Sequence, residues 1–204
     1  MAAGATARDG TPFVGLTGGI GAGKSAALEA LERLGAATLS SDAVVHDILG
    51  TDEAGRELAE RLGAGVAPGG RVDRDAVARV VFEDQGAREW LERYLWPKVG
   101  ERMVAWRAAL DSREPRPRAA VVEVPLLFES GLEEVFDFTI AVVADDDLRS
   151  ERIDARGHSG VASRESRQLA QTEKAERADF AVRNDGTLEE LERELAGLLA
   201  RMER

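Results

Sequence analysis

A short apolar segment near the start of the chain runs into glycines and ends in lysine and serine. Residues 13–17 form a short, largely apolar run that is followed by glycine, which is typical of a buried parallel strand. Residues 18–25 read Gly-Gly-Ile-Gly-Ala-Gly-Lys-Ser, and apolar residues at helical spacing then continue to Leu34, before Gly35. The sequence therefore predicts a strand, a glycine-rich loop and a helix in immediate succession.

This loop fills the pattern Gly-x-x-x-x-Gly-Lys-Ser, whose backbone N–H groups surround polyphosphate oxygens while the following helix directs its positive dipole end at the same anion. Lys24 is expected to reach the β and γ phosphates, and Ser25 to offer its hydroxyl to Mg²⁺. The alternative is a glycine-rich turn without a ligand. The residues predicted to contact a nucleotide are Gly18, Gly19, Ile20, Gly21, Ala22, Gly23, Lys24, Ser25 and Ala26.

Length and composition narrow the class of protein. A chain of 204 residues suits one α/β domain with modest insertions, and a net charge of −11 is repulsive toward nucleic acid. No apolar run approaches the length of a membrane span, and the first ten residues lack a signal peptide's apolar region. The absence of cysteine excludes thiolate chemistry and fits a reducing compartment. We expect a cytoplasmic protein that binds neither nucleic acid nor membrane; its oligomeric state stays open.

A carboxylate follows the second predicted strand. Residues 36–39 form this strand, and Ser40, Ser41 and Asp42 are suitable caps for a helix that runs through Ile48. Ligands bind at the carboxyl ends of strands in open α/β sheets, so Asp42 can act there on an acceptor hydroxyl. The spacing alone slightly favours the alternative, a plain helix cap.

Residues 52–111 have a helical pattern, and only the region of Val66 is compatible with a strand. Pro97 is placed as the first residue of a helix whose apolar stripe is expected in the core. Suitable caps precede two further helices, namely Thr51 or Asp52, and Asp73. We expect a helical insertion beside the sheet, where the second substrate binds.

Two acidic residues belong to the third strand and the turn after it. Residues 119–124 read as a buried strand, and Pro-Leu-Leu-Phe-Glu follows at 125–129. Glu123 loosely fits the position that holds Mg²⁺ directly or through water in phosphate-loop proteins. A buried glutamate is costly without a partner, which favours a metal or a basic neighbour. Functional and structural roles remain equally open for Glu123 and Glu129.

The last third of the chain contains two more predicted strands, at 138–144 and 180–182, separated by polar helices rich in arginine. Arg152 and Arg156 lie one turn apart on one helix face. A mobile hairpin of this kind can close over phosphates, or it can be a solvated surface with nearly balanced charges. Thr187 and Glu190 form a capping box for the closing helix.

Five blocks in this order resemble those of the dephospho-coenzyme A kinases, over about residues 14–195. The blocks are Gly15 to Ser25, Ser41-Asp42, Val124 to Glu129, Arg164 with Gln168 and Lys174, and Ala178-Asp179-Phe180 before Asn184-Asp185-Gly186. The resemblance implies an α/β fold of the P-loop NTPase, nucleoside-monophosphate-kinase-like type: three layers, with a parallel five-stranded sheet, a helical substrate-binding insertion and a lid. It implies a single P-loop kinase domain over 1–204, with core segments about 12–50, 118–145 and 178–204, the insertion about 51–112 and the lid about 146–177.

The resemblance also implies an activity: Mg²⁺-dependent transfer of the ATP γ-phosphate to the ribose 3′-hydroxyl of dephospho-coenzyme A, the final step of coenzyme A biosynthesis. Asp42 then orients and deprotonates the hydroxyl, and the other catalytic residues are Lys24, Arg152 and Arg156. Asn184 and Gly186 are implied near the adenine of ATP, and Ser25 and Glu123 near the metal. The implied substrate-binding residues are Asp42, Trp96, Pro125, Leu126, Glu129, Arg164 and Gln168.

Three positions depart from the family's usual pattern. Ala22 and Ala26 replace two loop hydroxyls, Ser40 stands where an aspartate is common, and Trp96-Pro97 stands where His-Pro is usual. Trp96 therefore keeps open a second hypothesis, another small-molecule P-loop kinase with a different acceptor. A third hypothesis is a non-catalytic nucleotide-binding module, although the guanine-reading Asn-Lys-x-Asp of a GTPase is absent after the fourth strand.

Overall fold

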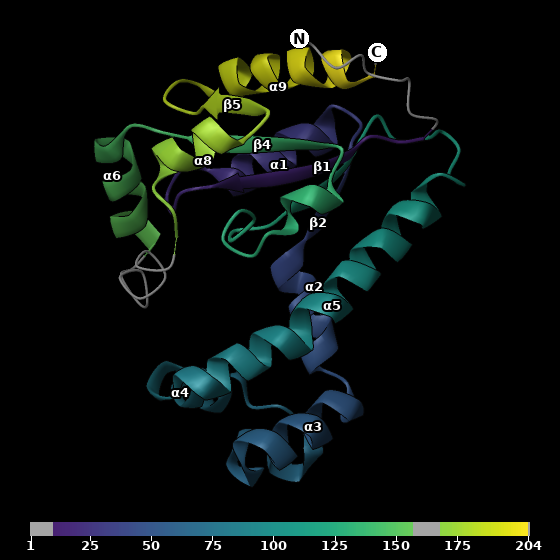
Figure 1. Ribbon diagram of the computed structural model, residues 1–204. Coiled ribbons are helices and arrows are strands. Elements are labelled where there is room, and N and C mark those ends of the chain that lie inside the picture. Colours follow the sequence, from purple (N-terminus) through teal and green to yellow (C-terminus); the bar gives the residue numbers. More distant parts are fainter. Residues whose placement is uncertain (1–9, 157–167, 204) are drawn as a thin grey trace. The chain divides into compact units, whose positions relative to one another are not determined.

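The computed structural model describes residues 10–156 and 168–203. Its contacts divide the chain into two compact units, which we call the sheet unit, Met1–Ser40 with Arg107–Arg204, and the helical unit, Ser41–Trp106. Figure 1 labels the elements of both. No helix within the described ranges combines the length and apolarity that crossing a membrane requires.

The sheet unit is built on five parallel strands in the order β2-β3-β1-β4-β5. These strands are β1 (Phe13–Gly18), β2 (Ala37–Ser40), β3 (Ala120–Glu123), β4 (Phe138–Val143) and β5 (Phe180–Arg183). All five predicted strands are confirmed to within two residues at either end. Because the strands are parallel, their carboxyl ends meet at one edge of the sheet, and the central strand β1 ends there in the glycine-rich loop.

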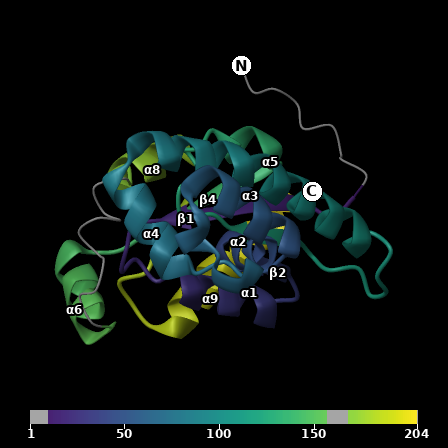
Figure 2. The same cartoon turned by 90° about the horizontal axis from the view of Figure 1, so that it is seen from below.

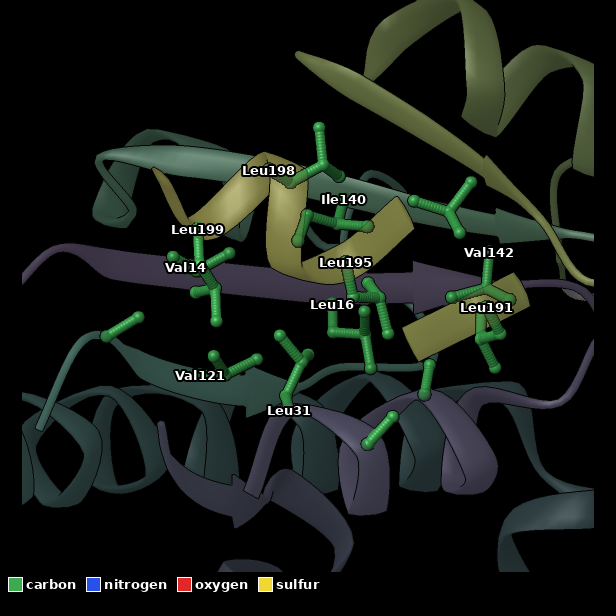
Figure 3. Packing of buried hydrophobic residues seen from close by; sticks show 14 of the residues in the cluster. Val14, Leu16, Leu31, Val121, Ile140, Val142, Leu191, Leu195, Leu198 and Leu199 are labelled. Atoms are coloured by element: carbon green, nitrogen blue, oxygen red, sulfur yellow. The ribbon is translucent and has the colours of Figure 1, made fainter. Parts of the chain in front are cut away.

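Two helices cover one face of this sheet, α1 (Lys24–Arg33) and α9 (Leu188–Met202). They lie side by side, and Figure 2 shows them together below the strands. In Figure 3, Leu31 of α1 and Leu195 of α9 point toward Leu16 of β1. All three side chains are almost completely buried. The predicted capping box starts α9, since Thr187 Oγ1 accepts from Glu190 N and Glu190 Oε2 accepts from Thr187 N.

The other face of the sheet is covered by the segment after β3 and by α8 (Gln171–Arg177). Alternation along β1 puts Gly15 and Thr17 on this face, opposite to Val14 and Leu16. A Cβ at Gly15 would press against the ring of Phe136, so the glycine lets this aromatic side chain pack directly on the strand. The predicted three-layer α/β architecture is therefore confirmed.

The helical unit contains α2 (Ser41–Leu49), α3 (Asp52–Leu62), α4 (Arg74–Glu83) and most of α5 (Gln85–Leu110). Thr51 caps α3 by accepting from Ala54 N at 3.2 Å, and Asp73 caps α4, as predicted. The prediction that the region of Val66 could form a strand was wrong. Val66 ends a 3₁₀ turn (Ala64–Val66) that begins after Gly63, whose φ of 98° turns the chain sharply.

The prediction that Pro97 begins a helix was also wrong, because Pro97 lies inside the 26-residue helix α5. Proline cannot donate to the carbonyl of Arg93 four residues earlier, which favours a break. Pro97 is exposed, however, so solvent can satisfy that carbonyl. Leu95 and Val99 are buried on either side of it, and their packing favours a continuous helix.

Candidate active site

The glycine-rich loop connects the end of β1 to the start of α1, as predicted. A Cβ at Gly18 would collide with the carbonyl oxygen of Val142 on β4, and one at Gly23 would collide with the side chain of Asn184. Both glycines also have positive φ, at 152° and 92°. Only glycine therefore allows the loop to lie this close to the neighbouring strand end.

No side chain caps the N-terminus of α1, so no capping side chain accepts a hydrogen bond from the backbone N–H groups of its first turn. Gly23 occupies the N-cap position and offers no side-chain hydrogen bond, and the turn contains no acidic residue. Ser25 is exposed at this end. An uncapped helix N-terminus behind a glycine loop is suited to bind the oxygens of a polyphosphate.

Lys24 folds back over the loop. Its Nζ donates to the carbonyl oxygens of Gly18 and Gly19, at 3.1 and 3.0 Å. The ammonium group thus lies directly beside the loop backbone, on which a nucleotide phosphate would rest. This position agrees with the role expected for the lysine of such a loop.

Three side chains from other elements bind carbonyl oxygens of the loop. Asn184, after β5, donates from Nδ2 to Ala22 O at 2.9 Å. Arg149 and Arg152 lie on α6 (Asp146–Arg156), and they donate to Ile20 O at 2.9 Å and Gly21 O at 3.4 Å. Arg152 also donates to the backbone oxygen of Asn184 at 3.0 Å. Two arginines one turn apart therefore bring positive charge to the loop.

Arg149 was not among the predicted site residues, although it lies three residues before Arg152 and thus on the same face of the helix. The spacing was a usable indication. In the structure Arg149 also forms an ion pair with the exposed Asp146, at 2.6 Å.

Of the remaining predicted lid residues, the structure describes the side chain of only one. Arg156 is the last residue of α6, and its side chain lies outside the described part, as does all of Arg164. Gln168 borders a cavity of about 270 Å³ that reaches the loop at Gly19. The cavity is lined by Gly19, Asp146, Arg149, Gln168, Leu169, Ala170, Gln171 and Thr172.

Asn184 and Gly186, which were predicted to lie near adenine, each have a structural role. Asn184 is buried and holds the loop, while Gly186 is exposed in the turn before α9. A Cβ at Gly186 would collide with the carboxylate of Glu190, so the glycine leaves room for the capping box. Proximity to adenine stays a prediction for both residues.

The turn at 125–129 contains a buried ion pair that sequence reasoning did not assign. Glu129 Oε1 lies 2.9 Å from Nζ of Lys174 on α8, which also donates to Pro125 O at 2.6 Å. Burial lowers the pKa of Lys174, and the hydrogen bond to Glu129 opposes this effect. Pro125 and Leu126 are half-buried beside the pair. The basic neighbour expected for a buried glutamate is therefore found at Glu129.

Glu123, proposed for the metal, ends β3 and is half-buried. In the sheet register it lies opposite Leu16 of β1 and Ser40 of β2. Glu123 therefore lies at the carboxyl edge of the sheet, because its partner Leu16 is two residues before Gly18, where the glycine loop begins. This position suits a role toward a bound cation. In the ranges that the structure describes, no cluster of three or more acidic or histidine side chains forms a ready-made metal site.

Two predicted acceptor residues lie in the helical unit. Asp42 is exposed in the first turn of α2, two positions after β2 ends. Within the described residues its carboxylate accepts no hydrogen bond, so no capping interaction engages it. Trp96 is exposed on α5, with 37% of its surface accessible. Among the residues that the structure describes, no hydrogen bond, ion pair or ring contact engages either side chain.

Residues 12–190 match a protein-family model described as dephospho-CoA kinase. The chain belongs to this family. A dephospho-CoA kinase of Protochlamydia amoebophila is 36% identical over 190 residues, which cover 91% of this chain and 93% of the relative. The family consists of ATP-dependent kinases, so the predicted enzyme class is confirmed.

Solved structures agree with this assignment. TT1252 from Thermus thermophilus has a TM-score of 0.80 and 33% identity, over 95% of this chain and 98% of that one. Dephospho-CoA kinase from Campylobacter jejuni has a TM-score of 0.68 and 26% identity, with 94% and 96% coverage. The P-loop kinase fold that the family resemblance implied is thus confirmed along nearly the whole chain.

Proposed function

We propose that this chain transfers the γ-phosphoryl group of ATP to the ribose 3′-hydroxyl of dephospho-coenzyme A, yielding coenzyme A and ADP. The observation that carries the proposal is the glycine loop of a member of the dephospho-CoA kinase family, with its carbonyl oxygens bound by Asn184, Arg149 and Arg152. The loop supplies the donor half of the reaction.

On the donor side, the first-turn N–H groups of α1 bind the phosphates, and Lys24 moves from the loop carbonyls to the β and γ oxygens. Arg152 and Arg156 neutralise the charge that develops during transfer. Mg²⁺ fits this site because the exposed Ser25 hydroxyl and the Glu123 carboxylate are oxygen ligands of the kind it prefers. The bound ion would neutralise phosphate charge.

On the acceptor side, Asp42 takes the proton of the 3′-hydroxyl. The hydroxyl oxygen forms a bond to the γ phosphorus while the bond from that phosphorus to the β–γ bridging oxygen breaks, so ADP leaves. The exposed carboxylate of Asp42 supports this role because no hydrogen bond within the described residues engages it. Trp96, Pro125, Leu126, Glu129, Arg164 and Gln168 complete the proposed acceptor set.

We further propose a division of the chain into three parts. The core comprises about residues 12–50, 118–145 and 178–204, the helical substrate-binding insertion about 51–112, and the lid about 146–177. The net charge of −11 supports the proposal that nucleic acid is not a partner. The absence of cysteine supports a cytoplasmic location.

A coupled ADP-release assay with ATP and Mg²⁺, run with and without dephospho-coenzyme A, tests the activity. We expect ADP release to depend on the acceptor, and phosphorus NMR of the product to show a new 3′-phosphate. A parallel panel of shikimate, nucleosides and nucleoside monophosphates tests the other acceptors. A higher kcat/KM on any of these would contradict the proposal.

One observation favours a second candidate, a small-molecule kinase for another acceptor. Trp96-Pro97 replaces the usual His-Pro, and the indole of Trp96 is exposed on α5. An exposed indole is suited to stack on a planar group. The same acceptor panel, repeated with Trp96→His, separates the candidates. Under the primary proposal, this variant retains its preference for dephospho-coenzyme A.

A further inference from the structure

Lys174 is the one lysine whose side chain is fully buried among the described residues. It lies on α8, and its Nζ has three oxygen partners. These are Pro125 O at 2.6 Å, Glu129 Oε1 at 2.9 Å and Thr17 Oγ1 at 3.5 Å. A buried ammonium is tolerated only with such partners, and here they come from two other segments of the chain.

The two segments held by Lys174 are the end of β1 and the turn at 125–129. Thr17 immediately precedes the glycine loop, and its Oγ1 also donates to Pro125 O at 3.3 Å. Backbone pairing continues the contact, since Val124 N donates to Leu16 O at 2.8 Å. Lys174 therefore lies where the strand that enters the phosphate loop meets the turn after β3.

A third segment joins through the same carboxylate. Glu129 Oε1 accepts a hydrogen bond from Leu169 N at 2.7 Å, just before α8 begins. Gln171 then binds both N and O of Ala144 after β4, at 3.1 and 2.7 Å. Segment 168–172 lines the cavity beside Gly19, so the ion pair also fixes one wall of that cavity.

Stability alone does not account for an ion pair in this position. Burying two charges costs free energy that their attraction barely recovers, and apolar residues of similar volume are often at least as stabilising. Glu129 Oε2 is buried and makes no hydrogen bond within the described chain, which adds to the cost. A requirement for exact placement of the three segments would explain the arrangement.

We propose that Lys174 is a positioning residue for phosphoryl transfer. It holds the root of the phosphate loop and the turn at 125–129 at a fixed separation, and so aligns the donor and acceptor halves of the site. The inference rests on the proposed function, in which this turn faces the acceptor. Lys174 itself touches neither substrate, because its side chain is fully enclosed by protein.

Alignment and nucleotide binding are separable in this structure. The loop carbonyls are held by Asn184, Arg149 and Arg152, through hydrogen bonds that do not involve Lys174. Loss of the ammonium group should therefore leave the phosphate loop able to bind ATP. It should instead increase the distance or angle between the reacting groups, and a misplacement of about 1 Å can cost about a hundredfold in rate.

The test compares Lys174→Met with Arg177→Met. Arg177 lies one turn further along α8 and contacts the same region, donating to Phe128 O at 3.5 Å and Glu133 Oε1 at 2.7 Å, but 39% of its side chain is exposed. We expect kcat of Lys174→Met to fall by about tenfold to a hundredfold, with Kd for ATP from calorimetry changed less than about threefold. Arg177→Met should retain kcat.

The double variant Lys174→Met/Glu129→Met separates positioning from stability. Removing both charges should recover the urea midpoint lost in Lys174→Met, because no unpaired buried charge remains. Positioning predicts that kcat stays low, since the hydrogen bond to Pro125 O is still missing. Recovery of kcat together with the midpoint would overturn the proposal.

Normal kcat in Lys174→Met would overturn it equally. If that single variant does not fold, Thr17→Val decides, because Glu129 belongs to the proposed acceptor set and its loss alone can lower kcat. In Thr17→Val, reduced kcat with intact ATP binding supports positioning, and wild-type kcat refutes it. If wild-type protein prefers another acceptor, only the proposed function fails, because the same kcat ratios can be measured with the acceptor that the panel identifies.

Discussion

The side-chain amide of Asn184 donates to the carbonyl oxygen of Ala22 at 2.9 Å, and this hydrogen bond ties the end of β5 to the phosphate loop. The backbone of Asn184 is itself fixed, because its N–H donates to Val143 O and its carbonyl accepts from Arg152. Hydrogen bonds to the sheet edge and to α6 therefore fix the position of the loop.

We predict that Asn184→Ala weakens ATP binding. Loss of one loop hydrogen bond should raise Kd for ATP by about threefold to tenfold, measured by calorimetry. The effect acts on the ground state and the transition state alike, so kcat at saturating ATP should change little. An unchanged Kd would show that the loop holds its shape without this contact.

Asp42→Asn should reduce kcat by about a hundredfold to ten-thousandfold, because the amide cannot accept the acceptor's proton. Folding should be unaffected, since Asp42 is exposed. Asp47→Asn, an exposed change on the same helix, is the matched control for loss of one charge and should retain activity. The measurement is steady-state ADP release with dephospho-coenzyme A; wild-type turnover in Asp42→Asn would exclude the assigned role.

Metal removal tests the proposed ligands. Chelation of Mg²⁺ should abolish ADP release, and added Mg²⁺ should restore it. Ser25→Ala should raise the Mg²⁺ concentration for half-maximal rate by at least about tenfold, because one oxygen ligand is lost. Ser150→Ala changes another hydroxyl, which donates to Asp146 O, and should leave the Mg²⁺ dependence unchanged.

The pKa of Asp111 is lowered chiefly by the hydrogen bond that it accepts from the backbone N–H of Thr11, at 3.1 Å. A carboxyl whose folded pKa lies below its unfolded value stabilises the folded state above the unfolded pKa, and this contribution disappears as pH falls through the folded pKa. Wild-type protein should therefore lose more unfolding free energy than Asp111→Asn between about pH 5 and about pH 3 in urea titrations. Equal losses would contradict the assignment.

The sheet was predictable because its signals are local. Each strand is a short apolar run, and the loop pattern fixes what precedes and follows it. Pro97 was misread because a local rule for proline was applied where packing of Leu95 and Val99 prevails. Val66 was misread because an isolated apolar residue between glycines has no periodicity to show that the chain turns.

The site was predictable in part, for the same reason. The loop, Lys24 and Ser25 are contiguous in sequence, whereas the contacts of Arg149 with Ile20 and of Lys174 with Pro125 join residues far apart in the chain. Residue type alone does not reveal such pairs. From sequence alone, a lysine on a polar helix is expected to be exposed. Only the fold shows that Lys174 is buried beneath the strand ends.

The order of the strands has a consequence for how the protein is made. β1, the strand that leads into the loop, pairs with β3 and β4, so both of its edges stay unpaired until residues 120 and 138 have been synthesised. The helical unit, Ser41–Trp106, has left the ribosome before either of these partner strands. The loop gains its last support only when Asn184 emerges. Nucleotide binding is therefore one of the last properties that the growing chain acquires.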